Sequence, residues 1–178
     1  EYPMIATARL SGMMLDYPKL LDKGIGGLRS DLQEKLKEQP DNNFYKAGIQ
    51  CLDIFVDCAS HLQQDARDQM ASADEKRQKE LERICQALEN IKEKKPGTFH
   101  EAMQLFWLFA LLAGVINYGR LDDYLGPYLV ADLESGRLTD EEAYRYIHSL
   151  WTMIENRRTT VNGRIIVGGK GRKQPKEA

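Results

Sequence analysis

An unbroken apolar run constrains this chain more than any other feature of its sequence. Residues 105–116 contain no charged side chain, and a helix start signal, Thr98-Phe-His-Glu101, precedes them. A helix that is apolar on every side is buried within a large protein. The run is also shorter than the roughly 20 residues that a membrane-spanning helix requires. We therefore expect residues 105–116 to lie in the interior of a large structure.

A polar cluster follows this run at once. Asn117, Arg120 and Asp122 stand in the sequence Asn-Tyr-Gly-Arg-Leu-Asp. An arginine and an aspartate two residues apart either form an internal ion pair or hold a small anionic or hydroxylated substrate. Both alternatives stay open for Arg120 and Asp122. Because buried charges must be paired or functional, the position directly after the buried run makes the cluster a candidate wall of a substrate cavity.

Helical periodicity dominates the rest of the chain and predicts a mainly α fold. Apolar residues recur at three- and four-residue intervals over residues 17–39 and over residues 81–91, and a short helix is expected at residues 124–133. Ser72 and Thr139 each stand three residues before a glutamate, which is the spacing of a capping box. A further helical stripe, which we expect to be buried, consists of Phe44, Ala47, Cys51, Phe55, Cys58 and Leu62.

One segment has the character of a buried strand. Residues 163–168 form a β-branched run bounded by glycines. A single strand cannot satisfy its own backbone hydrogen bonds, and the chain offers only weak partners at residues 4–9 and 115–118. The strand and the apolar helix together predict that something further completes this structure.

Composition excludes several classes of function. The net charge of −2 predicts no general affinity for nucleic acid or membrane. Residues 157–178 are basic, with seven Lys or Arg and one Glu, which fits either a phosphate-binding tail or a solvated segment. The cysteine count is odd and no Cys-x-x-Cys pair occurs, so we expect no disulfide or zinc site and a reducing, cytoplasmic compartment.

The remaining candidates for chemistry are better explained as structural residues. The cysteines lie in apolar stripes, where a buried thiol is inert, and no histidine has a ligand partner at metal-binding spacing. Residues 163–170 lack the Lys-Ser/Thr order of a phosphate-binding loop, and Gly24-Ile-Gly-Gly27 lies within a helical pattern. These core or structural residues are Cys51, Cys58, Cys85, His61, His100 and His148.

Several segments together resemble the glycyl radical enzymes, the superfamily of pyruvate formate-lyase and glycerol dehydratase. The more specific blocks are Phe99-His-Glu-Ala102 and Tyr118-Gly-Arg-Leu-Asp122. Supporting blocks are Asp16-Tyr-Pro-Lys-Leu-Leu-Asp-Lys-Gly24, Phe44-Tyr-Lys-Ala47, Leu138-Thr-Asp-Glu-Glu-Ala143 and Val167-Gly-Gly-Lys-Gly-Arg172. The resemblance covers nearly the whole chain in the right order.

This resemblance implies a ten-stranded α/β barrel wrapped in helices. The chain would be an N-terminal portion, with outer helices over residues 1–95, a buried helix and barrel-wall segment over 96–168 and a basic tail over 169–178. The implied chemistry is anaerobic cleavage of a carbon–carbon, carbon–oxygen or related bond in a small substrate, by a lyase or a formate acetyltransferase-like transferase. A glycyl radical, installed by an activating enzyme that uses S-adenosylmethionine and an iron–sulfur cluster, passes its unpaired electron to a cysteine. A homodimer is also implied.

The chain departs from the family pattern in instructive places. The cysteine loop and the radical glycine loop are absent, so no catalytic residue is assigned and these 178 residues alone are not expected to be active. Dehydratase-like members often carry a substrate-facing His where this chain has Met13, and a Gln where it has Asp123. The candidate cavity-wall residues are Asn117, Arg120, Asp122 and Met13.

Two other functions compete with this interpretation. The first is a non-catalytic helical interaction module made of residues 17–95 and the basic tail. The second is a free-standing small enzyme that uses Arg120 and Asp122. The chain begins Glu-Tyr-Pro without an initiator Met, which suggests processing or an internal piece, and the radical-enzyme interpretation predicts a much longer open reading frame.

Overall fold

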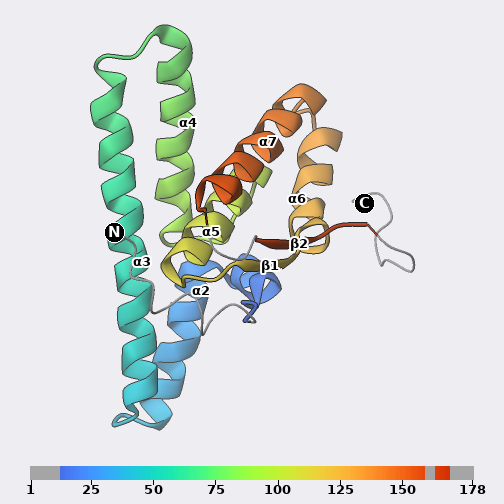
Figure 1. Cartoon of the computed structure of the whole chain (residues 1–178). Helices are drawn as coiled ribbons and strands as arrows, with labels where there is room; N and C mark the ends of the chain where they lie inside the picture. The colour runs from blue at the N-terminus through green and yellow to red at the C-terminus, as the bar shows by residue number, and fades with distance from the viewer. Residues whose placement is uncertain (1–12, 159–162, 169–178) are drawn as a thin grey trace. The chain divides into compact units, whose positions relative to one another are not determined.

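The computed structural model of the chain describes residues 13–158 and 163–168, and Figure 1 shows the order of its elements. The predicted strand at residues 4–9 and the basic tail at 169–178 lie outside the described residues. The mainly helical fold with a few strands is confirmed. The elements are α2 (Tyr17–Glu38), α3 (Asn43–Met70), α4 (Glu75–Ile91), α5 (Phe99–Leu112), β1 (Asn117–Arg120), α6 (Leu121–Glu134), α7 (Asp140–Asn156) and β2 (Arg164–Ile166).

The chain divides into two compact units. One consists of Glu1–Tyr17, Gly97–Met103 and Ala110–Ala178, and it contains both strands together with α6 and α7. The other consists of Pro18–Pro96 and Gln104–Phe109, and it contains most of α2 with α3 and α4. Helix α5 contributes residues to both units. The candidate cavity-wall residues all belong to the unit with the strands.

Helices α3 and α4 lie side by side (Figure 1) and are joined by a buried polar side chain. Gln63 is only 4% exposed. Its amide nitrogen donates to the Cys85 carbonyl at 2.9 Å and to the Glu89 carboxylate at 3.0 Å, while its oxygen accepts from Lys92 Nζ at 3.1 Å. A buried amide must be hydrogen-bonded, so Gln63 fixes the register of the two helices.

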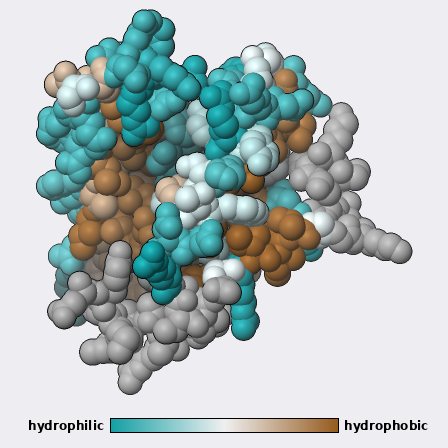
Figure 2. All heavy atoms as spheres, turned by 45° about the horizontal axis from the view of Figure 1, so that its top comes forward, coloured by the Kyte–Doolittle hydropathy of each residue, from teal (hydrophilic) through white to brown (hydrophobic). Residues whose placement is uncertain are grey.

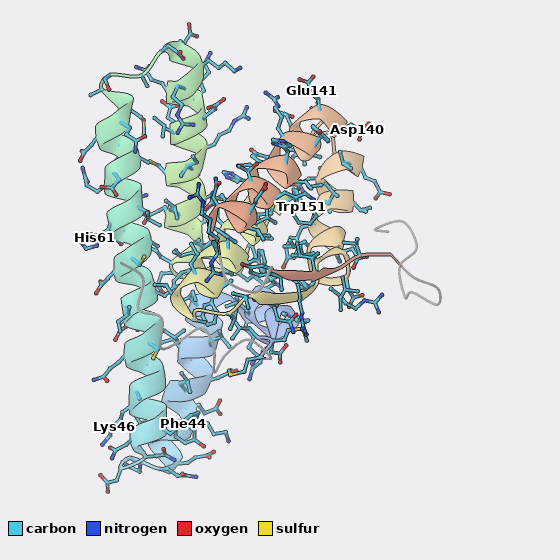
Figure 3. The ribbon with its side chains drawn as sticks, viewed as in Figure 1. Phe44, Lys46, His61, Asp140, Glu141 and Trp151 are labelled. Atoms are coloured by element: carbon cyan, nitrogen blue, oxygen red, sulfur yellow. The ribbon has the colours of Figure 1, made fainter. Side chains whose placement is uncertain are left out.

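The predicted buried stripe of α3 is wrong in most of its members. Phe44 is 77% exposed, Leu62 is 42% exposed and Cys51 is also exposed; Figure 3 labels Phe44 and His61 on this helix. The face that is buried consists of Leu52, Phe55, Ala59, Gln63 and Ala66. Helix α3 carries two apolar stripes, and α4 covers the one that holds Gln63.

A glycine cluster in α2 allows a close contact between backbones. Gly24 has φ 64° and ψ 179°, which kinks the helix and which glycine adopts without the penalty paid by other residues. A Cβ at Gly26 would overlap the Glu93 carbonyl oxygen. The cluster therefore brings α2 against the segment that follows α4, in keeping with its position inside a helical pattern.

The helix caps match the sequence signals in part. Thr139 forms the full capping box with Glu142 at the start of α7, as predicted. At α4 the predicted cap at Ser72 is wrong, because Asp74 is the N-cap and accepts from Arg77 N. At α5 the Thr98 hydroxyl accepts from Glu101 N, as a capping box requires, and the Glu101 carboxylate accepts from Gly97 N.

The two strands form a parallel pair. Asn117, Gly119 and Arg120 of β1 are in register with Arg164, Ile165 and Ile166 of β2, and Met14 makes an isolated parallel bridge to Asn117. Because β1 covers residues 117–120, the neighbour expected at 115–118 is shifted by two residues, whereas the expected strand at 163–168 is confirmed as an element. The burial of β2 is not, since Ile166 is 51% and Val167 61% exposed. Within the described residues β2 is an edge strand, which leaves its outer side open.

The burial predicted for the long apolar run holds for half of its residues. Leu105, Phe106 and Ala110 are inaccessible to solvent. The last turn of α5 differs, because Leu111 is 39% and Leu112 46% exposed. Figure 2 shows that apolar side chains reach the surface of the molecule beside polar ones. Across residues 13–158 and 163–168, no helix combines the length and hydropathy needed to cross a membrane.

Candidate functional site

The polar cluster predicted from the sequence forms the turn from β1 into α6. Asn117 begins β1, Arg120 ends it, and Asp122 lies in the first turn of α6. Arg120 is exposed, while Asn117 and Asp122 are half-buried. Met13 is 48% exposed and precedes Met14, which is bridged to Asn117. The structure therefore gathers Asn117, Arg120 and Asp122 at one turn, with Met13 on the neighbouring segment.

A bulge in β1 decides which way these side chains face. The ladder pairs Asn117 with Arg164 and Gly119 with Ile165, so Tyr118 is an extra residue in the strand. In a regular strand, residues 117 and 120 would point to opposite faces. With the extra residue, Asn117 and Arg120 oppose residues 164 and 166 of β2, which share a face. The bulge thus places Asn117 and Arg120 on the same side of the strand pair.

Local contacts hold the bulge in this form. Gly119 adopts φ 62°, a left-handed conformation in which side chains other than glycine are strained. Its N–H donates to Asn117 Oδ1 at 3.2 Å, and a Cβ on Gly119 would overlap Met14 Sδ. The Asn-Tyr-Gly order is therefore a structural requirement of the turn, and one oxygen of Asn117 is already engaged there.

Asp122 fastens the start of α6 to the exit of β2. Its Oδ2 accepts the N–H of Gly168 at 2.8 Å. This carboxylate oxygen is used by the main chain rather than by Arg120. A carboxylate in the first turn is also favoured by the helix dipole. The structure therefore gives Asp122 a definite positioning role and leaves the Arg120 guanidinium directed to solvent.

A hollow of about 150 Å³ lies beside this turn. Apolar side chains of α5, α6 and α7 line it together with Val167, and Asp122 is the one charged residue among its lining residues. Trp151 of α7, labelled in Figure 3, forms part of this lining and is 41% exposed. An apolar hollow with few polar groups is typical of sites for small organic ligands.

Three buried tyrosines support the turn, and none of them is among the residues predicted for the site. The Tyr124 hydroxyl donates to the Tyr118 carbonyl at 2.6 Å, and the rings of Tyr124 and Tyr17 stack with centroids 5.0 Å apart. Burial raises the pKa of both Tyr17 and Tyr124 well above the ordinary value, so both remain neutral. Tyr118 and Tyr124 flank the Gly-Arg-Leu-Asp block, which is the signal that could have found them.

Arg157 completes this support from the end of α7. One nitrogen of its guanidinium donates to the Val115 carbonyl at 2.6 Å and to the Tyr118 hydroxyl at 2.8 Å. Arg157 and Tyr118 are 39 residues apart in the chain, so no local pattern in the sequence relates them.

The cysteines show no sign of a reactive thiol. Cys85 is buried and donates weakly to the Gln63 carbonyl, and burial raises the pKa of the half-buried Cys58 thiol. Cys51 is exposed, which corrects its predicted place in the core. None of the three forms a disulfide in the described part of the chain.

The histidines have structural neighbours. The His100 ring stacks on Tyr146 with centroids 4.8 Å apart, and His61 Nδ1 lies 2.9 Å from the Asp57 carbonyl oxygen. Among the residues that the structure describes, no three His, Cys, Asp or Glu side chains form a group that could hold a metal ion.

Comparison with known proteins places this turn in a family context. The profile of the pyruvate formate lyase-like family matches residues 3–174. An isethionate sulfite-lyase of Bilophila wadsworthia (strain 3_1_6) is 30% identical over 153 residues, which are 76% of this chain and 18% of that protein. A probable dehydratase, YbiW, of Escherichia coli (strain K12) is 30% identical over 162 residues, or 80% of this chain and 20% of that protein.

A solved structure shows the same fold. The crystal structure of a glycyl radical enzyme from Archaeoglobus fulgidus superimposes with a TM-score of 0.73 over 89% of this chain and 21% of that one, at 24% identity. The chain spans about a fifth of the length of each of these proteins.

Proposed function

Because this chain belongs to the pyruvate formate lyase-like family, we propose that it forms part of the substrate-cavity wall of a glycyl radical lyase that acts on a small organic molecule. The family match over residues 3–174 carries this proposal, since it includes the β1–α6 turn and both strands. The same match includes α2, α3 and α4, which removes the reason to treat these helices as a separate interaction module.

We assign the substrate contacts to the face of β1 that bears Asn117 and Arg120. An exposed guanidinium offers several donors in a planar fork that suits a carboxylate, sulfonate or phosphate group. Asn117 keeps its amide N–H groups as donors, because its oxygen accepts from Gly119. Met13 supplies apolar wall beside them. The proposed substrate is a small hydroxylated or anionic compound, in keeping with the relative that acts on isethionate.

The complete protein supplies the radical chemistry in this proposal. A glycyl radical takes the hydrogen atom of a cysteine thiol, and the resulting thiyl radical starts cleavage of a carbon–carbon, carbon–oxygen or related bond. We place neither the radical glycine nor that cysteine on this chain, whose cysteines lie on α3 and α4. The proposed partners are an activating enzyme that uses S-adenosylmethionine and an iron–sulfur cluster, and a second copy in a cytoplasmic homodimer.

Exposed apolar side chains support a larger surrounding structure. Leu111, Leu112, Ile166 and Val167 are each at least 39% exposed. Burial of apolar surface away from water stabilises a folded protein, and a radical site must exclude water. We propose that the remainder of the complete protein covers these residues, with residues 1–95 as outer helices and residues 96–168 as the cavity wall.

Anaerobic activation of the complete protein tests the radical proposal. We expect electron paramagnetic resonance to show a carbon-centred glycyl radical signal after incubation with the activating enzyme and S-adenosylmethionine. Isethionate and small polyols would then be screened for release of sulfite or loss of water. A complete protein that never develops the signal with an active activating enzyme contradicts the proposal.

The role of Arg120 is tested in the same protein. Loss of a charge-assisted hydrogen bond costs about 1.5–3 kcal/mol, so Arg120→Gln should raise KM for an anionic substrate by roughly tenfold or more. Arg158→Gln removes an equal charge from an exposed position outside the β1 face and serves as the matched control. An unchanged KM in Arg120→Gln removes Arg120 from the proposed site.

A further inference from the structure

We propose that Arg157 is a positioning residue for the substrate-binding face of β1, an inference that rests on the function proposed above. Arg157 is the C-cap of α7 and donates to the hydroxyl of Tyr118, a residue of β1. Nothing in its local sequence distinguishes it from Arg158. The structure distinguishes them. Arg157 is half-buried and donates to Tyr118 of β1 and to Val115 just before it, whereas Arg158 is exposed.

The first step of the argument concerns the residue that Arg157 holds. Tyr118 is the extra residue of the β1 bulge, and its side chain is 1% exposed. Its hydroxyl accepts from Arg157 at 2.8 Å, and its carbonyl accepts from the Tyr124 hydroxyl at 2.6 Å. Tyr118 is thus fixed at both its side chain and its backbone, which stabilises the bulge against a return to regular pairing.

The second step concerns the segment that leads into the strand. Arg157 also donates to the Val115 carbonyl at 2.6 Å, and the Arg164 N–H donates to the Ile116 carbonyl at 2.9 Å. Val115 and Ile116 are buried, where an unpaired carbonyl would be costly. Arg157 therefore satisfies a buried carbonyl and fixes Tyr118 with the same guanidinium nitrogen.

The consequence for the site follows from the bulge. Asn117 and Arg120 share a face only while Tyr118 remains the extra residue of the strand. Without the Arg157 contacts, residues 117–120 could also pair with β2 in the regular register. In that register the Arg120 side chain would lie on the opposite face of the strand pair. Arg157 touches neither substrate nor reacting atoms in this proposal and acts through Tyr118.

The test compares Arg157→Gln, Arg157→Lys and the control Arg158→Gln in the complete protein. Hydrogen–deuterium exchange of residues 117–120 should rise about tenfold in Arg157→Gln, less in Arg157→Lys, and not in Arg158→Gln. Exchange in α3 and α4 should stay unchanged. Unchanged exchange over residues 117–120, or an equal rise throughout the protein, overturns the proposal.

Kinetics separate positioning from simple loss of folding. In the activated enzyme, Arg157→Gln should raise KM for the substrate at least about fivefold with the glycyl radical content per protomer unchanged. A lower radical content with an unchanged KM contradicts positioning. The exchange measurement needs no turnover, so it tests Arg157 even if the radical proposal fails.

Discussion

The carboxylate of Asp132 accepts the backbone N–H of Phe99 at 2.8 Å, so the last turn of α6 caps the first residue of α5. Asp132 is only 4% exposed and is also paired with Arg137, whose Nη2 lies 2.7 Å from Asp132 Oδ1. The Asp132 carbonyl accepts from Leu138 N at 3.2 Å. One buried acid thus ties together the start of α5, the end of α6 and the approach to α7.

Replacement of this acid should be among the most destabilising single changes in the chain. Asp132→Ala leaves the buried Phe99 N–H without its acceptor, so we expect the free energy of unfolding to fall by about 2–4 kcal/mol in chemical denaturation. Arg137→Ala is the control. Its side chain is 52% exposed, and we expect a loss of about 1 kcal/mol or less. Equal losses in the two variants would show that the ion pair, not the cap, stabilises this junction.

Gly136, which lies between α6 and α7, is a matched control for Gly119 in the β1 turn. Both have positive φ, 62° and 71°, but a Cβ would overlap Met14 Sδ at Gly119 and would meet nothing within 4 Å at Gly136. Gly136→Ala should cost about 1 kcal/mol from backbone strain alone. Gly119→Ala should lower the free energy of unfolding by about 1 kcal/mol more than Gly136→Ala does. This difference should disappear when both variants are made in a Met14→Ala background. A difference that survives Met14→Ala would place the conflict elsewhere.

Gly26 tests the contact between backbones at the kink of α2. A Cβ at this position would overlap the Glu93 carbonyl oxygen, which cannot move without its chain segment. We expect Gly26→Ala to lower stability by about 2–4 kcal/mol. Gly27→Ala faces only the Lys23 side chain at 3.1 Å, so its effect should be within about 1 kcal/mol. Thermal and urea unfolding measure both, and a neutral Gly26→Ala would rule out the close approach.

The buried tyrosines predict a loss of stability at high pH. Burial raises the pKa of Tyr124 and Tyr17 in the folded state above the value of about 10 expected in the unfolded chain. The folded state therefore keeps protons that the unfolded state releases, and stability falls as pH rises beyond about 10. In Tyr124→Phe, the free energy of unfolding should fall less steeply with pH in this range. Phenolate absorbance from Tyr17 or Tyr124 that develops before unfolding would contradict it.

The helices could be predicted from the sequence because their apolar spacing is regular. The expected helix at residues 17–39 corresponds to Tyr17–Glu38, and the Thr139 box begins α7 as expected. The buried face of α3 could not be predicted, since Cys51 and Leu52 belong to two neighbouring stripes that both contain apolar residues. Only the position of α4 decides which stripe is covered, and that depends on contacts such as Gln63 with Lys92.

The polar turn that follows the apolar run could be recognised in the sequence, whereas its contacts could not. Arg120 and Asp122 could be singled out because they follow the apolar run directly. The sequence could not show that Asp122 binds Gly168 N, 46 residues away, or that Arg157 reaches Tyr118. Such contacts depend on which strand edges meet, and no local spacing encodes them.

The extra residue in β1 also limits how sequences can be compared at this place. Side chains of a regular strand alternate between its two faces, and the extra residue Tyr118 reverses this alternation for the residues that follow it. An insertion or deletion of one residue between 115 and 120 would preserve the composition of the segment while it moved the guanidinium to the opposite surface. Chimeras that exchange this segment between relatives should therefore preserve its length even where its amino-acid sequence changes.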